Sequence, residues 1–437
     1  MNLPEHIRYC LQALEEAGFA AYCVGGCVRD SLLGRTPQDY DICTAALPEQ
    51  TEAVFSGHKL VLAGKKHGTV GVIFEKDVVE ITTFRTEGEY RDNRHPEWVE
   101  FVPDIKEDLA RRDFTVNAMA WSPTRGFADP FGGQSDLDKG ILRAVGDPVK
   151  RFQEDSLRIL RGLRFAARYG LTMEEATRQA MFSQRQLMDN LARERVFDEL
   201  CKLLTAITDP KMLVSFGPIL AAVIPELEPM LGFDQRSPHH AYDVFTHTAH
   251  VVTGVPADLT LRWAALLHDV GKVPTFTQDA TGRGHFYGHA QASAEMADAI
   301  LHRLKAPTQL REQAVLLIDR HMVKPEPDRK LLRRRVSQYG WDGLTQLLQL
   351  QQADFGSKGV NEKGPDFDSI TALLQQIRAE DSCLSLKDLA LNGHDLMAMG
   401  YQGKAIGETL NQLLEQVLEE ALPNDREALV SYLQTGR

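Results

Sequence analysis

The sequence predicts a mixed α+β head followed by a body that is helical almost throughout. Runs typical of strands, apolar, alternating or β-branched, occur only before residue 145, at 20–24, 69–74, 78–84 and 98–102. After VGDP (145–148), apolar residues at helical spacing continue to the end of the chain, interrupted by Gly and Pro. Strands followed by a long run of helices indicate an α+β unit joined to separate helical domains.

These changes in periodicity and composition divide the 437 residues into four predicted domains. A length of this order fits two to four domains. The last predicted domain has apolar residues at helical spacing, but its residues suggest no particular chemistry. The predicted domains are the head (1–147), a helical neck (148–230), a helical body (231–365) and a helical tail (366–437).

Composition limits the location and the partners of the protein. The net charge is −12, so a polyanion would have to bind where Lys and Arg gather locally. The six cysteines are scattered without a CxxC pair, as in reduced cytosolic proteins. No apolar run approaches the roughly 18 residues of a membrane span, and the first residues lack the apolar core of a signal peptide. We therefore expect a soluble cytoplasmic protein with no membrane partner.

The stretch VGGCVRDSLLGRTPQDYD combines glycines, a cation and two carboxylates. Asp39 and Asp41 would share one face of a strand, and their repulsion would be relieved by a divalent cation, for which oxygen ligands favour Mg²⁺. Gly25 and Gly26 would let bare backbone approach a triphosphate, and Arg29 would add a charged donor. A turn followed by a solvated acidic loop, without a bound ligand, would explain the same stretch of sequence.

A third carboxylate would complete a two-metal site for in-line phosphoryl displacement. Glu80 is our candidate, because it alternates with Val79 and Ile81 and so points away from the core face of its strand.

Five ordered segments resemble those of bacterial tRNA nucleotidyltransferases, the family of CCA-adding enzymes and bacterial poly(A) polymerases within the DNA polymerase β-like superfamily. The segments are GGCVRDSLLG, DYD, RRDFTVNA, DPFGG and EDSLRILRGLRFA. The resemblance covers roughly residues 20–230. It implies a palm-type head in which Asp39 and Asp41 hold Mg²⁺ as catalytic residues, with Gly26, Arg29 and Arg112 at the incoming nucleotide.

The segment from 151 to 170 is predicted to be one helix, on which Asp155 and Arg158 share a face and Glu154 lies four residues before Arg158. Taken alone, it would be a surface helix with ion pairs. The family resemblance implies instead that it selects the nucleotide. Asp155 would accept from the amine of cytosine or adenine while Arg158, held by Glu154, donates to the ring nitrogen.

Uracil and guanine reverse both of these contacts, so UTP and GTP would be rejected. Further along the same stripe, Arg161 and Arg164 would reach the phosphates of the nucleotide or the RNA. EGEYRDNRHPEWVEFV, at 87–102, resembles the loop that supports the change from C to A addition, and its presence argues against an enzyme that adds only C.

The body contains histidines and aspartates in an order that resembles an HD phosphohydrolase domain. Imidazoles with carboxylates suit transition metals better than Mg²⁺. Three interpretations stay open: a metal site that hydrolyses phosphate esters, a structural metal site, or a metal-free helical brace. The predicted ligands are His247, His268, Asp269 and Asp354, with His289 and His321 available for a second metal.

Two basic regions, the stripe at 151–168 and DRKLLRRR at 328–335, are candidates for contact with duplex RNA phosphates, which are bound by shape and charge. A solvated charged segment is the alternative for 328–335.

The function predicted from these patterns is template-independent addition of CCA to tRNA with CTP and ATP, using Mg²⁺. Poly(A) polymerase or an A-adding enzyme is the alternative within the same fold. An HD phosphohydrolase with an RNA-binding head, or a non-catalytic RNA chaperone, would belong to other classes. No DNA partner is expected.

Overall fold

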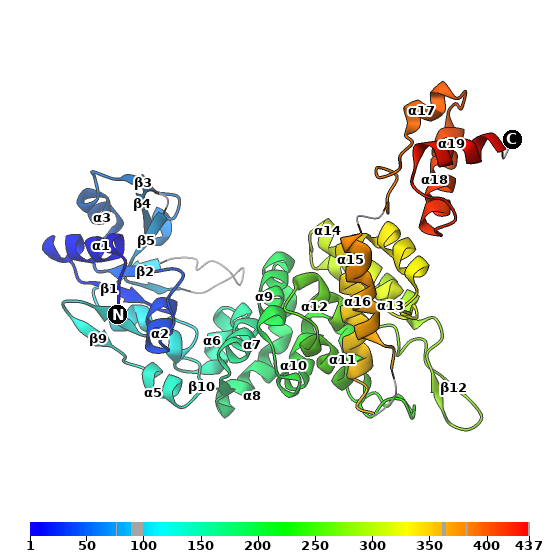
Figure 1. Ribbon diagram of the computed structural model, residues 1–437. Helices are drawn as coiled ribbons and strands as arrows, with labels where there is room; N and C mark the ends of the chain where they lie inside the picture. Colours follow the sequence, from blue (N-terminus) through cyan, green and yellow to red (C-terminus); the bar gives the residue numbers. More distant parts are fainter. Residues whose placement is uncertain (76, 89–98, 361–363, 381–382, 436–437) are drawn as a thin grey trace. The chain divides into compact units, whose positions relative to one another are not determined.

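The computed structural model describes residues 1–75, 77–88, 99–360, 364–380 and 383–435 (Figure 1). The chain forms two compact units, Met1–Glu228 and Pro229–Arg437. The first contains the predicted head and neck, and the second contains the predicted body and tail. The finer divisions within each unit stay predictions.

The head is built on a seven-stranded mixed sheet. Only β2 and β5 run parallel, because α3 and the β3–β4 hairpin lie between them in the sequence. The predicted strands agree with the structure to within a few residues. In spatial order the sheet contains β3 (Lys59–Val61), β4 (Thr69–Phe74), β5 (Asp77–Thr83), β2 (Asp41–Thr44), β1 (Ala21–Val24), β8 (Ala120–Ser122) and β9 (Gly126–Ala128).

Short helices pack on this sheet. The strands β6 (Arg85–Glu87) and β7 (Val99–Phe101), which follow β5 in the sequence, form a separate antiparallel pair. Buried apolar residues such as Val24, Phe84 and Ala120 form a core on one side of the central strands. The helices of the head are α1 (Glu5–Glu16), α2 (Gly26–Leu32), α3 (Pro48–Val54), α4 (Ile105–Ala110) and α5 (Gly133–Asp138).

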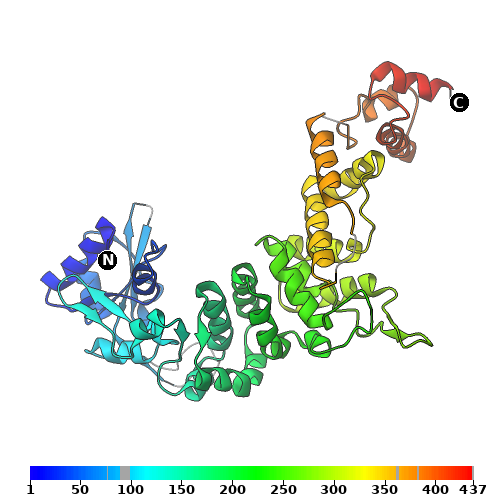
Figure 2. The same ribbon diagram turned by 60° about the horizontal axis from the view of Figure 1, so that its bottom comes forward.

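The neck is helical, as predicted, and α7 packs closely on α9. One strand contact, β10 (Ile141–Leu142) with β11 (Thr172–Met173), ties it to the end of the head. Figure 2 shows these helices in turquoise and green. They are α6 (Pro148–Glu154), α7 (Leu157–Tyr169), α8 (Glu175–Gln184), α9 (Arg193–Ala206) and α10 (Pro210–Val223).

Two local expectations were wrong. The predicted single helix over 151–170 is broken at Asp155, whose backbone is extended (φ −143°, ψ 102°), so Asp155 and Arg158 do not share a helix face. The carboxylate of Asp155 accepts a hydrogen bond from the backbone N–H of Leu157 at 3.0 Å, in competition with continued helix. Asp39 lies in the loop before β2, so only Asp41 belongs to the strand.

The second unit is helical apart from a small hairpin, β12 (Thr277–Gln278) and β13 (Gly284–His285). Both views show α16 alongside α15, which is kinked at Gly340, where φ is +72° (Figures 1 and 2). The helices are α11 (Val244–Gly254), α12 (Leu259–Leu267), α13 (His289–Arg303), α14 (Thr308–Arg320), α15 (Arg329–Gly356), α16 (Phe367–Ala379), α17 (Gly393–Ala398), α18 (Lys404–Leu418) and α19 (Arg426–Thr435). Within the described ranges, no helix combines the length and the apolar character needed to cross a bilayer.

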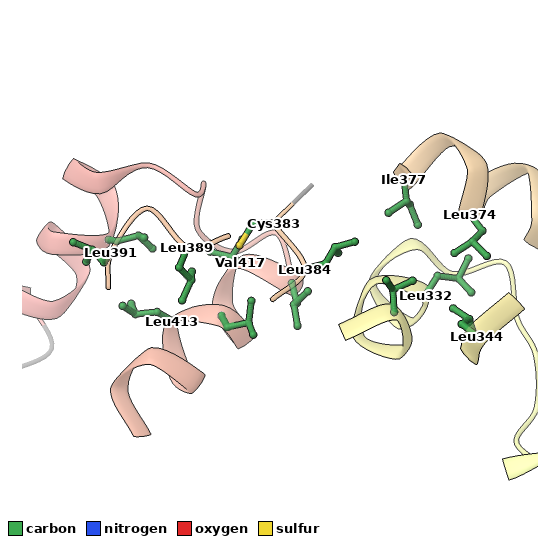
Figure 3. Close-up of a cluster of buried hydrophobic side chains, with 14 of the residues drawn as sticks. Leu332, Leu344, Leu374, Ile377, Cys383, Leu384, Leu389, Leu391, Leu413 and Val417 are labelled. Carbon is green, nitrogen blue, oxygen red and sulfur yellow. The ribbon is translucent and has the colours of Figure 1, made fainter. Parts of the chain in front are cut away.

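One cluster of buried apolar residues joins α15 to the predicted tail, 366–437 (Figure 3). Leu332 and Leu344 lie on α15, whereas Leu374, Leu391 and Leu413 lie in the tail. The predicted boundary at 365/366 therefore cuts through a continuous apolar cluster.

Arg329 and Arg334, in the basic segment 328–335, are paired with acidic residues of the predicted tail. Arg329 bonds Glu380 and Glu420, and Arg334 bonds Glu415 at 3.1 Å as well as Glu419. Arg335 donates to the carbonyl of Lys324 at 2.8 Å. The ion pairs of Arg329 and Arg334 agree with the alternative of a charged surface segment, and contact of this segment with RNA stays a prediction.

Candidate functional site

A polar cavity of about 590 Å³ lies in the first unit. Its lining comes from the turn before α2, the loop before β2, residues 111–117, the α6–α7 break and α7 itself. Eight arginines and five aspartates line it, an excess of three positive charges in a chain of net charge −12. The local concentration of cations expected for a polyanion binder is therefore found here. The predicted residues that line it are Gly25, Gly26, Arg29, Asp39, Asp41, Arg112, Asp155, Arg158, Arg161 and Arg164.

The glycine turn depends on the absence of a side chain at Gly25. Its φ is +72°, a left-handed conformation that favours glycine. A Cβ there would also lie 2.9 Å from Nη1 of Arg112. The turn therefore brings the start of α2 against the arginine at the cavity wall.

Arg29 is held in place on every side. It is 5% exposed, donates to Oδ1 of Asn117 and to the hydroxyl of Tyr169 at 2.6 Å, and lies 4.3 Å from the centre of the Tyr169 ring. Its Nε donates to Oδ1 of Asp30 at 2.9 Å. Asn117 in turn donates to Asp113 at 3.1 Å, so the side chain is part of a preorganised network.

Asp41 and Asp39 face the cavity together. The surrounding protein desolvates Asp41 and raises the pKa of its carboxyl; Arg112 lowers it, and the charge of Asp39 raises it further. Two adjacent carboxylates in a partly desolvated place, facing a solvent-filled cavity, fit a divalent cation, which would remove this electrostatic cost. These two residues are the ones that would hold such a cation.

Glu80 is not brought into the cavity. The parallel pairing of Ile42 with Ile81 puts Glu80 level with Asp41 on the neighbouring strand. Its side chain is exposed, and it is absent from the described cavity lining. Its role as a third carboxylate stays a prediction.

Arg158 is fixed by three hydrogen bonds. Its guanidinium donates to Glu154 Oε2 at 2.7 Å, to the carbonyl of Arg151 at 3.1 Å and to the carbonyl of Arg111 at 3.0 Å. The predicted contact with Glu154 is thus present, although the two residues lie on different helices.

Asp155 reaches the same cavity from the break between α6 and α7. Arg195, on α9, donates to its Oδ2 at 3.4 Å. Sequence reasoning missed Arg195, because its 40-residue separation from Asp155 leaves no local signal of the pairing. Asp155 and Arg158 are therefore both oriented by neighbouring residues, on one wall of the cavity.

Arg161 and Arg164 line the cavity but are anchored by acidic partners. Arg161 bonds Asp113 through two nitrogens, at 2.9 and 2.7 Å, and Arg164 bonds Glu199 at 2.6 Å. Burial opposes ionisation of Asp113, yet Arg161 outweighs it and holds the pKa of that carboxyl at about 2. Asp113 and Glu199 had no predicted role; each fixes an arginine whose side chain borders the cavity.

A second group of titratable residues meets in the second unit. His247, His268 and Asp354 form one set of three potential metal ligands, and Asp269, His289 and His321 form another; within each set the ligand atoms lie within 4.8 Å of one another. All six residues predicted from the sequence are therefore brought together.

Asp269 faces both sets. Its Oδ2 lies 3.5 Å from Nε2 of His247 and 3.2 Å from Nε2 of His268, and its Oδ1 lies 3.6 Å from Nε2 of His289. A carboxylate between two groups of imidazoles is suited to bridge two metal ions. Burial lowers the pKa of His321 to about 4, so its ring is neutral at pH 7 and available as a ligand.

Two buried atoms test whether these six residues fit a metal ion. His268 Nε2 and Asp269 Oδ2 have no hydrogen-bond partner of good geometry among the described residues, although Lys272 Nζ forms an ion pair with Asp269 Oδ2 at 2.8 Å. Buried polar atoms are rarely left unsatisfied, and a metal ion would satisfy both. The donor set fits a metal, and it adjoins a second cavity of about 270 Å³.

The loop expected to support the change from C to A addition lies mostly outside the described residues, since 89–98 are not described.

A mixed sheet with two aspartates beside a glycine turn, facing an arginine-rich helical wall, defines a nucleotidyltransferase head with a helical body. Family models agree along the chain. They match a poly(A) polymerase head domain at residues 21–143, a probable RNA-binding and SrmB-binding site of polymerase A at 170–231, and domain 2 of tRNA nucleotidyltransferase at 285–433.

Curated relatives match over nearly the whole length. A CCA-adding enzyme of Bacillus velezensis is 32% identical, with 97% of this chain and 96% of the relative covered. One of Streptococcus pneumoniae is 34% identical, with 99% and 98% covered. The chain therefore belongs to the CCA-adding enzyme family.

Solved structures share the fold. The CCA-adding enzyme of Bacillus stearothermophilus, solved in complex with CTP, aligns with a TM-score of 0.75 at 26% identity, covering 100% of this chain and 98% of that one. The Thermotoga maritima enzyme complexed with tRNA aligns with a TM-score of 0.62 at 21% identity, covering 100% and 97%.

Proposed function

We propose that this protein adds CCA to the 3′ end of tRNA, using CTP and ATP and no nucleic-acid template. The observation that carries the proposal is that Asp39 and Asp41 line the same cavity as Asp155 and Arg158. A pair of metal-ligand carboxylates and a pair of base-reading side chains then serve one bound nucleotide. Membership of the CCA-adding enzyme family supports the same activity.

The reaction is a nucleotidyl transfer, in which one bond between oxygen and phosphorus forms and another breaks. The oxygen of the tRNA 3′-hydroxyl forms a bond to the α-phosphorus, the bond to the bridging oxygen of the β-phosphate breaks, and pyrophosphate leaves as the hydroxyl proton is released. Mg²⁺ held by Asp39 and Asp41 would supply charge neutralisation and Lewis acidity at this centre. Arg29 and Arg112 would bind the triphosphate as fixed cations.

The base would be selected by Asp155 and Arg158. Asp155 accepts from the amine of cytosine or adenine, and Arg158 donates to the ring nitrogen. Its three hydrogen bonds hold Arg158 before the nucleotide arrives, so little ordering cost accompanies binding. Arg161 and Arg164 supply further positive charge for phosphates of the nucleotide or RNA.

Single-nucleotide incorporation on tRNA transcripts ending before the first C, after one C and after two C tests this proposal. We expect C, C and A to be added in turn, and no extension with UTP or GTP. Long A tails on unrelated RNA without C incorporation would identify a poly(A) polymerase instead.

We also propose a cytoplasmic location. All six cysteines lie in the described part of the chain and none of them forms a disulfide, as expected in a reducing compartment.

A second function is favoured by the convergence of the six ligands in the second unit. We propose that they bind two transition-metal ions and that the site hydrolyses phosphate esters. A water oxygen would bond to phosphorus as the bond to the ester oxygen breaks, and the alcohol would leave with one of the water's protons. Metal analysis of the purified protein, together with phosphate release, tests it; a protein free of metal after incubation with Mn²⁺ or Co²⁺ would contradict it.

A further inference from the structure

The β12–β13 hairpin region presents an aromatic ring at the second cavity. Tyr287 lines this cavity and is 77% exposed, the highest value among the exposed large apolar side chains of the described structure. A tyrosine so exposed makes little contribution to the core. Its position beside metal ligands calls for an explanation other than packing.

The ring is held in one orientation although it is exposed. It stacks on the imidazole of His285, with ring centres 5.3 Å apart and an angle of 7° between the planes, and its hydroxyl lies 3.4 Å from Nδ1 of that ring. His285 Nε2 lies 2.9 Å from Oδ2 of Asp279, whose other carboxylate oxygen accepts from the backbone of Thr281 at 2.8 Å. The outer face of Tyr287 is thus a fixed, flat surface, and a partner that stacks on it loses little to ordering.

The rest of the cavity is suited to an anion. Asp269, His289, His321 and Asp354 supply metal ligands to its wall, and Lys272 and Lys358 add two cations. Lys272 is 5% exposed, donates to Oε1 of Gln235 at 2.9 Å and forms an ion pair with Oδ2 of Asp269 at 2.8 Å, so Lys358 is the more available of the two cations. One compact cavity therefore offers a metal-bound phosphoryl position and a flat aromatic surface.

We propose that Tyr287 is the base-binding residue of this second site, whose substrates are nucleoside phosphates. The phosphoryl group lies at the six metal ligands and the base stacks on Tyr287. A flat heteroaromatic ring carried by a phosphate ester is the chemistry that both features recognise together, since every nucleobase has a face that stacks on an aromatic side chain. This inference rests on the hydrolytic function proposed above.

Adenosine 5′-monophosphate and ribose 5-phosphate form a matched pair that differs only in the base. The experiment measures phosphate release from each, in the presence of Mn²⁺ or Co²⁺, by the full-length wild type and by Tyr287→Ala and Tyr287→Phe. We expect the ratio of kcat/KM, nucleotide over ribose phosphate, to fall at least about fivefold in Tyr287→Ala, through KM, because a stacked base contributes roughly 1–3 kcal/mol. Tyr287→Phe keeps the ring and should keep the ratio. Thermal unfolding shows whether each variant is folded.

The outcomes separate the two claims. If the wild type hydrolyses the nucleotide and Tyr287→Ala has the same ratio, the base-binding role is wrong while the hydrolytic function stands. If the wild type releases phosphate from neither compound, the hydrolytic function is wrong. Binding isotherms of adenosine 5′-monophosphate then decide the role of Tyr287: weaker binding by Tyr287→Ala supports it, and identical isotherms contradict it.

Discussion

Replacing Arg158 by alanine tests the base-reading wall of the first cavity. In the structure its guanidinium makes three hydrogen bonds, two to the carbonyls of Arg111 and Arg151 and one to Glu154. The alanine variant loses the donor that meets the ring nitrogen of cytosine or adenine and that opposes the ring N–H of uracil. One such base contact corresponds to about 1–3 kcal/mol of discrimination. At about 1.4 kcal/mol per tenfold, preference for CTP over UTP should fall between about fivefold and a hundredfold.

The same change removes stability, because each lost hydrogen bond contributes about 0.5–1.5 kcal/mol. Incorporation must therefore be measured on protein shown to be folded by circular dichroism. Arg178→Ala is the matched control: this arginine is exposed, pairs with Glu175 on α8 and is not part of the cavity lining.

The assay is incorporation of a single C or U onto a tRNA transcript that lacks CCA, with kcat/KM determined for each nucleotide. Arg178→Ala should keep the wild-type ratio. A folded Arg158→Ala protein with an unchanged ratio of CTP to UTP would refute the base-reading role of this side chain.

The two sites support three further predictions. Asp41→Asn should abolish addition of both C and A, because a neutral amide replaces a metal-ligand carboxylate, whereas the exposed Asp138→Asn should not; residual transfer by Asp41→Asn above about 1% of wild type would argue against metal ligation. Asp113→Asn should lower the unfolding free energy at pH 7 by about 2 kcal/mol, because the pKa of Asp113 in the folded protein, about 2, is below the ordinary 3.8. This contribution to stability is present above pH 4 and is lost as the pH falls towards 2. Denaturation of wild type and variant should therefore show a smaller difference in unfolding free energy at pH 3 than at pH 7. His268→Ala should reduce the metal content of the second unit while C and A addition continue, and metal content equal to wild type would exclude His268 as a ligand.

Local patterns were sufficient to predict most of the fold. The alternation in 78–84 marks a strand because one face of it is buried, and the positive φ of Gly25 agrees with a turn where a side chain has no room. The order of His247, His268 and Asp269 predicted that imidazoles and carboxylates would lie together, and the structure brings them together; metal binding by them stays a prediction.

Features that depend on distant partners were not predictable. At the break, the carboxylate of Asp155 accepts a hydrogen bond from the backbone N–H of Leu157 and another from Arg195, forty residues away. The alternation of its strand predicted the face of Glu80, and the pairing of Ile42 with Ile81 puts it level with Asp41, but the sequence does not show that Glu80 lies outside the described cavity lining. The ion pairs of Arg329 with Glu380 and Glu420 were not predictable either, because the partners lie far apart in the sequence.

The central claim is that one cavity both performs the transfer and reads the base. A crystal structure of this protein with CTP and Mg²⁺ tests it most directly. We predict the triphosphate beside Asp39 and Asp41 and the Watson–Crick edge of cytosine on Asp155 and Arg158. Cytosine bound elsewhere, or a triphosphate remote from both aspartates, would contradict the account.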